Sequence, residues 1–272
     1  MIAARNLSLT LGGYAALRDV SADLRHGRVT AIIGANGAGK TSLIRSLAGL
    51  VIPQSGDVEI DGVALDALTH AQRARMIGYL PQDGEPAWNI SGAELVSLGR
   101  LPHRSRFALP SADDARAIER AMIATDTLAF ADRTIDTLSG GERARIKMAR
   151  VLAGEPQWIL ADEPLANLDP PHQRDMLALF RAAAAEGKGV VTVLHQLDAF
   201  GEKARLVGER NAGIDVEHLG TGLDLCQRIG DDAAVVAARH FLRQQLAAGR
   251  IDALADHHES ALEADDDLLL AG

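Results

Sequence analysis

Hydrophobic and polar residues alternate along the first part of the chain. The alternating apolar positions are Leu7, Leu9 and Leu11 in one segment and Val20, Ala22 and Leu24 in the next. A period of two residues is typical of β-strands that bury one face and expose the other. The pattern therefore predicts two strands ahead of the first continuous apolar run.

Short continuous apolar runs come next, and they indicate strands that are buried on both faces. The runs are VTAII (29–33), IGYL (77–80), WILA (158–161) and GVVTVL (189–194). DVEIDG (57–62) indicates a further strand followed by a turn. Helical patterns cover residues 41–50 and the stretch from about Pro170 to Glu186. Because strands and helices alternate, the chain is predicted to form a doubly wound α/β core.

Residues 91–133 are helical in pattern, and the stretch 84–155 is predicted to be a helical subdomain inserted into that core. SGAELVSLG (91–99) is helical in pattern, and SADDARAIERAMIA (111–124) combines a serine cap with an acidic first turn. The helix-like run RARIKMARVLAG comes directly after LSGGE (138–142). We expect one unit over residues 1–200 and an atypical segment over 201–272.

Composition narrows the class of protein. The chain has 272 residues, 47% of them apolar, and a formal net charge of −9. That charge argues against a general nucleic-acid or anionic-membrane binder. Cys226 is the sole cysteine, so an intrachain disulfide is excluded and a reducing compartment fits. We find no signal peptide and no apolar run near the ~18–20 residues of a membrane span, so we expect a cytoplasmic protein.

The segment GANGAGKT (34–41) matches the phosphate-binding pattern G-x-x-x-x-G-K-[ST] in full. It falls between a predicted strand and a predicted helix, which is the context that the pattern requires. The residues assigned to nucleotide binding are Gly34, Asn36, Gly37, Ala38, Gly39, Lys40, Thr41 and Ser42. Lys40 would meet the β- and γ-phosphates, and the Thr41 hydroxyl would ligate Mg²⁺. The competing interpretation is a chance glycine-rich turn.

Polar residues follow three further predicted strands. Asp162 and Glu163 end the WILA strand, and open α/β sheets bind ligands at the carboxyl ends of their strands. We assign Asp162 to Mg²⁺ and Glu163 to the attacking water; an acidic helix cap before Pro164 is the alternative. His195 after GVVTVL and Gln82 after IGYL point to the same edge. For these two, a structural histidine and a plain turn glutamine are the competing interpretations.

A second anion-binding pattern occurs about a hundred residues after the first. LSGGE places Ser139, Gly140 and Gly141 at the head of a predicted helix. Backbone N–H groups and the positive end of the helix dipole favour an anion at such a place. The sequence shows two phosphate-binding segments, but it does not show whether they serve one site.

Taken together, these residues resemble the nucleotide-binding subunit of an ATP-binding cassette (ABC) transporter over about residues 1–200. The resemblance is carried by Tyr14, GANGAGKT, LPQ, LSGGE, ILADEP, the LANLD loop (165–169) and His195. It implies an α/β fold: a P-loop nucleotide-binding core with an antiparallel β subdomain and an inserted helical subdomain. Two departures are mild: Glu142 replaces the commoner glutamine, and Asn167 stands where a small residue is usual.

The resemblance also implies roles. Tyr14 would stack on adenine, Gln82 would sense Mg²⁺, Glu163 would be the general base and His195 would hold the γ-phosphate. Asp169 would belong to the nucleotide site as well. In this family the LSGGE segment binds the ATP of the other subunit, so the chain would form a homodimer that sandwiches ATP.

The resemblance further implies the partners and the place of action. Separate integral membrane permease subunits would bind the dimer at the cytoplasmic face of the membrane, and a substrate-binding protein would act indirectly. No nucleic-acid partner is expected. The stretches LVSLGRLPHRSRF (95–107) and DPPHQRDML (169–177) resemble the corresponding stretches of the ATP-binding subunits of iron–siderophore, haem or cobalamin importers. An exporter ATPase, an iron–sulphur assembly ATPase and a subunit that binds nucleotide without turnover remain alternatives.

The resemblance ends at residues 201–272, which hold 14 acidic and 7 basic residues. ARLV (204–207) looks like a fragment of the next family strand, but no second strand follows at the expected spacing. Three interpretations stay open: an extension with helices at about 232–248 and 251–264, a shifted reading frame, and simple divergence. We expect this tail to pack poorly onto the core and to add nothing to the nucleotide site.

Overall fold

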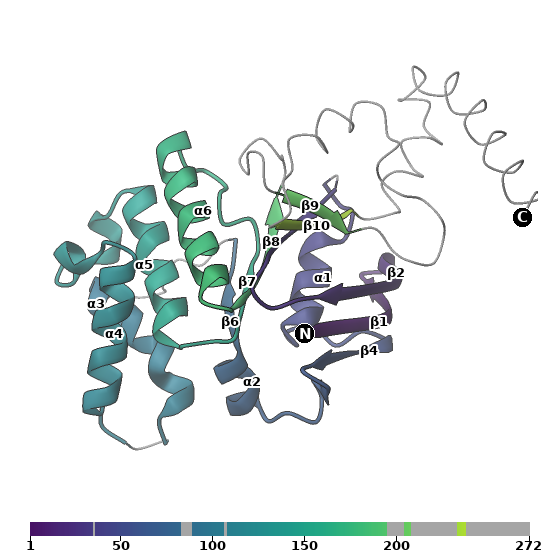
Figure 1. The fold of residues 1–272 in the computed structure, drawn as a ribbon, viewed down its shortest axis with the longest axis horizontal. Coiled ribbons are helices and arrows are strands. Elements are labelled where there is room, and N and C mark those ends of the chain that lie inside the picture. The colour runs from purple at the N-terminus through teal and green to yellow at the C-terminus, as the bar shows by residue number, and fades with distance from the viewer. Residues whose placement is uncertain (35, 83–88, 106–107, 195–203, 208–232, 238–272) are drawn as a thin grey trace, which may run out of the picture.

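The computed structural model describes residues 1–34, 36–82, 89–105, 108–194, 204–207 and 233–237. Its centre is a six-stranded sheet in the order β6-β7-β8-β3-β10-β9, in which every pair of neighbours is parallel (Figure 1). The strands are β3 (Val29–Ile33), β6 (Ile77–Leu80), β7 (Trp158–Ala161), β8 (Gly189–Leu194), β9 (Ala204–Val207) and β10 (Ala233–Ala237). All their carboxyl ends therefore meet at one edge of the sheet.

Both faces of the sheet are covered, which explains the continuous apolar runs. Along β7, Trp158 and Leu160 pack into one hydrophobic cluster, while Ile159 and Ala161 pack into the cluster on the opposite face. The first cluster includes helix α1 (Lys40–Leu47), and the second includes helix α6 (Pro170–Ala185). The predicted bounds of β3, β6, β7 and β8 are confirmed.

A second sheet of four antiparallel strands, in the order β2-β1-β4-β5, packs against the first cluster. Its strands are β1 (Ile2–Leu11), β2 (Tyr14–Leu24), β4 (Ser55–Ile60) and β5 (Val63–Ala64). Leu7 and Leu9 are buried as their alternation predicts, whereas Leu11 at the end of β1 is exposed. The antiparallel subdomain of the predicted fold class is therefore confirmed.

Helix α2 (His70–Met76) was not predicted from the sequence. It buries none of its residues, so it carries no apolar stripe that a periodicity argument could detect. Its start is marked by a capping box, in which Thr69 and Gln72 bond each other's backbone N–H groups. The spacing T-x-x-Q at 69–72 was the available signal.

Three α-helices form a separate cluster beside the central sheet, away from the antiparallel strands (Figure 1). They are α3 (Gly92–Ser97), α4 (Ala112–Ala124) and α5 (Gly140–Ala153), with short 3-10 turns at Leu98–His103, Leu128–Phe130 and Ile135–Thr137. A serine caps each helix, and the residue three positions later completes the box: Ser91 with Glu94, Ser111 with Asp114 and Ser139 with Glu142. Glu142 was noted in the sequence as a departure from the commoner glutamine. Its side chain nevertheless completes the capping box at this position.

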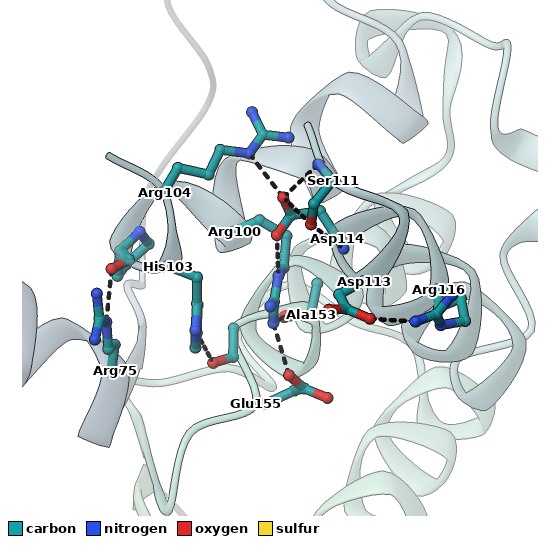
Figure 2. A network of polar contacts seen from close by, with 12 residues as sticks. Arg75, Arg100, His103, Arg104, Ser111, Asp113, Asp114, Arg116, Ala153 and Glu155 are labelled. Carbon is teal, nitrogen blue, oxygen red and sulfur yellow. Dashed lines mark hydrogen bonds and ion pairs between the residues drawn. The ribbon is translucent and has the colours of Figure 1, made fainter. Parts of the chain in front are cut away.

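A buried ionic network ties this helical cluster together (Figure 2). The Arg100 guanidinium donates to Asp114 Oδ1 at 2.9 Å, to the Ala153 carbonyl at 2.8 Å and to Glu155 Oε2 at 2.8 Å. Hydrogen bonds from Ser111 and the adjacent Arg100 charge hold the pKa of Asp114 well below its usual range. Arg100 therefore joins the start of α4 to the end of α5.

Two segments of the tail are part of the described structure. ARLV forms β9, which confirms the predicted strand fragment, but residues 233–237 form strand β10 instead of the start of a helix. β10 pairs with β3 and with β9, so these two segments extend the central sheet, while the expected poor packing of the rest of the tail stays a prediction. The proposed helix at 251–264 lies outside the described residues.

Among the described residues, no helix combines the length and the apolar character needed to cross a membrane.

The Arg100 network predicts that substitutions of two arginines, Arg100 and Arg116, differ in their effect on the stability of the protein. Arg100→Met keeps the side-chain length but removes the donor to Asp114 Oδ1 and to the Ala153 carbonyl, so it should lower the melting temperature by several degrees. Arg116→Met, which removes an exposed pair with Asp113, should change it little. Thermal unfolding followed by circular dichroism measures both.

The Arg100 effect should also fade in acid. Because the folded-state pKa of Asp114 is lowered, its stabilising contribution is complete above a pH of about 4 and is lost as the pH falls further. Equal and small effects of the two substitutions at neutral pH would contradict the assignment of Arg100 as the central contact.

Candidate functional site

The loop between β3 and α1 is shaped by glycines at its end. Gly37 has φ +79° and Gly39 has φ +87°, a left-handed conformation that side-chain-bearing residues rarely adopt. A Cβ atom on Gly39 would lie 2.1 Å from the Ala16 carbonyl oxygen. Lys40 then begins α1, and its Nζ donates to the Gly34 carbonyl at 2.8 Å across the loop. The loop is thus closed around the start of the helix, which favours anions.

The Lys40 side chain lies in a buried and acidic environment. The residue is 6% exposed. Burial lowers the pKa of its ammonium group, while the carboxylates of Glu163 and Asp162 act in the opposite direction. These two carboxylates therefore help to keep a cation at the base of the loop.

Asp162 follows β7 at the carboxyl edge of the sheet and is fully buried. The Thr41 hydroxyl donates to its Oδ1 at 3.0 Å, and the Tyr79 hydroxyl donates to its Oδ2 at 3.1 Å. A carboxylate and a hydroxyl are hard oxygen donors of the kind that Mg²⁺ takes, so the residues present fit the predicted metal. The predicted pair Thr41 and Asp162 is brought together.

Glu163 adopts an unusual backbone conformation, with φ +50°, and is 9% exposed. Gln82, which follows β6, donates from Nε2 to Glu163 Oε2 at 2.6 Å. Non-glycine residues held in left-handed conformations cluster at functional sites. The structure thus joins two residues that the sequence assigned separately to the reaction.

An open cavity of about 510 Å³ lies over these residues. Most of the predicted nucleotide-binding residues line it, and so do two residues that were not predicted, Leu11 and Ala16. The lining comprises Leu11, Tyr14, Ala16, Asn36, Gly37, Gly39, Lys40, Thr41, Ser42, Gln82 and Glu163. Tyr14 is 54% exposed, and its hydroxyl reaches the Gly37 carbonyl at 3.5 Å. An exposed aromatic ring beside a phosphate-type loop is suited to stacking on a base.

The LSGGE segment does not line this cavity. Ser139 caps α5, and nothing lies within 4 Å of a Cβ built on Gly140. A Cβ on Gly141 would meet the His172 ring, so this segment packs against the start of α6. Within one chain, the second anion-binding segment is therefore apart from the first.

Asp169 also lies outside the cavity lining. It caps α6 by accepting from the His172 backbone N–H and the His172 ring, and these bonds lower the pKa of its carboxyl group. Asn167, two residues earlier, has φ +62°, which asparagine tolerates better than most residues. Ser139 and Asp169 thus lie at neighbouring helix starts.

His195 lies outside the described residues, and its role stays a prediction. β8 ends one residue earlier, at Leu194, on the same sheet edge as Asp162.

Sequence reasoning missed Tyr79 and Arg45, which both approach Asp162. The available signals were a hydroxyl-bearing residue in the apolar strand IGYL and a cation four residues after Thr41, on the same face of α1.

The comparisons with known proteins agree on one family. The model of the family described as "ABC transporter" matches residues 17–166. The chain is 41% identical over 194 residues to the hemin import ATP-binding protein of Rhodococcus jostii (strain RHA1), a match that covers 71% of this chain and 66% of that one. It is 39% identical over 193 residues to the cobalamin import ATP-binding protein of Halobacterium salinarum (strain ATCC 29341 / DSM 671 / R1), covering 71% and 48%. The chain thus spans less than two thirds of either relative.

Among solved structures, a dimeric bacterial ABC transporter cassette superposes with a TM-score of 0.64 at 28% identity. That likeness covers 73% of this chain and 90% of the cassette.

Two glycines of the loop make a matched pair for mutation. Gly39→Ala adds a methyl group against the Ala16 carbonyl oxygen as well as backbone strain, so the loop must shift and nucleotide binding should be lost. Gly37→Ala adds strain of about 1–3 kcal/mol without a clash, because nothing lies within 4 Å, and should only weaken binding. Titration with a fluorescent ATP analogue measures both. Equal binding by the two variants would show that the close approach at Gly39 is unimportant.

Proposed function

Because the chain belongs to the ABC transporter family, we propose that it is the ATP-hydrolysing motor subunit of a membrane importer for an iron–siderophore, haem or cobalamin. The proposal that the chain hydrolyses ATP rests on one observation, the contact between Gln82 and Glu163. This contact lies at the same sheet edge as Lys40, Thr41 and Asp162. The import ATP-binding proteins among its relatives support the class of substrate.

Different residues of the cavity would bind different parts of the nucleotide. Tyr14 would stack on adenine, the loop from Gly34 to Ser42 would cradle the phosphates, and Lys40 would neutralise their charge. Thr41, Gln82 and Asp162 would hold Mg²⁺. The metal would supply charge stabilisation to the phosphoryl group that is transferred.

Glu163 is proposed as the general base. Its carboxylate would accept a proton from the attacking water, and the Gln82 amide at 2.6 Å would fix its orientation. The left-handed backbone holds the carboxylate at the end of β7, where its charge acts on the Lys40 ammonium. His195 would hold the γ-phosphate.

The distribution of the two anion-binding segments supports a homodimer. Since Ser139, Gly140, Gly141 and Asp169 are apart from the cavity of their own chain, a second copy would bring them to it and sandwich ATP. The dimeric cassette among the structural neighbours is consistent with this arrangement. The dimer would act peripherally, at the cytoplasmic face of the membrane, on integral permease subunits, and indirectly on a substrate-binding protein.

The first prediction concerns the base. Glu163→Gln should keep ATP binding and lower hydrolysis by roughly a hundredfold or more, because proton acceptance is lost while size is kept. Lys40→Ala should lose nucleotide affinity as well. Phosphate release and binding of a fluorescent ATP analogue separate the two effects. Glu186→Gln, at an exposed ion pair near the opposite sheet edge, is the matched control and should leave both unchanged. Hydrolysis by Glu163→Gln near the parent rate would rule out this base.

The second prediction concerns the dimer. A Lys40→Ala chain mixed with a Ser139→Arg chain gives mixed dimers in which one intact loop faces one intact LSGGE segment. If the segments act in trans, partial ATPase activity should return on mixing, although each variant alone is inactive. If they act within one chain, no mixture holds a complete site. Absence of recovery in a sample shown to contain mixed dimers would reject the sandwich.

A further inference from the structure

Tyr79 connects strand β6 to the buried carboxylate of Asp162. Its hydroxyl donates to Asp162 Oδ2 at 3.1 Å, and the other carboxylate oxygen, Oδ1, accepts from Thr41 at 3.0 Å. Each oxygen of Asp162 thus has a hydrogen bond from a different element, β6 on one side and α1 on the other. Two such bonds restrain the rotation of the carboxylate plane.

Arg45 determines which way the Tyr79 hydroxyl points. Arg45 Nε donates to the Tyr79 oxygen at 3.5 Å and lies 3.8 Å from Asp162 Oδ2. A guanidinium has donors and no acceptor, so the hydroxyl proton cannot be directed at it. The proton is therefore directed at Asp162.

The backbone around Tyr79 is also held in place. Arg150 of helix α5 donates from Nη2 to the Tyr79 carbonyl at 2.9 Å. The preceding residue, Gly78, leaves no room for a side chain, because a Cβ there would lie 2.6 Å from Val151 and 2.9 Å from Pro156. A rigid strand end makes the Tyr79 hydroxyl a fixed donor.

We infer that Tyr79 is a positioning residue that orients the Asp162 carboxylate toward the Mg²⁺ of the nucleotide complex, with Arg45 orienting the Tyr79 hydroxyl in turn. The inference rests on the proposed function for the metal and the nucleotide. Hydrogen bonds to metal-ligating carboxylates fix their geometry, and their loss typically costs 10–100-fold in metal affinity. Tyr79 itself acts through Asp162.

The test replaces one atom. Tyr79→Phe keeps the ring and removes the hydroxyl. Mn²⁺ binding, titrated by electron paramagnetic resonance in the presence of a non-hydrolysable ATP analogue, should weaken about tenfold. Binding of the analogue in EDTA should match the parent protein, whereas the metal-free melting temperature should fall, because the buried Asp162 carboxylate loses one donor. In the ATPase assay, more Mg²⁺ should be needed for half-maximal rate, and saturating Mg²⁺ should restore the maximal rate.

A double-mutant comparison separates positioning from a general structural role. In an Asp162→Asn background, Tyr79→Phe should cause no further loss of Mn²⁺ affinity, because both changes act on one interaction. Unchanged Mn²⁺ affinity in the single variant, or an equal further loss in the Asp162→Asn background, would overturn the inference. A parent protein that binds Mn²⁺ and the analogue without hydrolysing ATP would overturn the proposed function instead and leave the Tyr79 comparison valid.

Discussion

The need to satisfy one fully buried carboxylate organises the centre of this protein. A charge without solvent is costly unless hydrogen bonds and nearby cations compensate for it. Asp162 meets this requirement with hydroxyl donors from α1 and β6 and with the Lys40 ammonium nearby. The same contacts fix the start of α1 relative to the ends of β6 and β7, so compensation of the charge and assembly of the cavity are one event.

Three residues with left-handed backbone conformations lie around that carboxylate. Glu163, Gly37 and Gly39 have positive φ, and each of them lines the cavity. Such conformations persist only where surrounding packing determines them. Here the packing comes from a parallel sheet with hydrophobic clusters on both faces, which leaves the strand ends little freedom to relax.

The sequence predicted best what depends on local pattern. The bounds of β3, β6, β7 and β8 follow from apolar runs, and the glycine-rich connection between β3 and α1 follows from a complete motif. Helix α2 was not predicted because it buries no side chain. Tyr79 and Arg45 escaped because their role depends on which strand lies beside β7, a tertiary fact that no local pattern contains. For the same reason the sequence could not show that Ser139 and Asp169 lie apart from the cavity of their own chain.

Helix α5 connects the LSGGE segment to strand β6. Its N-cap, Ser139, lies outside the cavity. Near its other end, Arg150 donates a hydrogen bond to the carbonyl of Tyr79, three residues before Gln82. At 1.5 Å per residue, the two points are about 16 Å apart along the axis. A helix resists compression along its axis far better than a loop does. A displacement of α5 would therefore reach β6, the strand that leads to Gln82 at the cavity, through the Arg150–Tyr79 hydrogen bond.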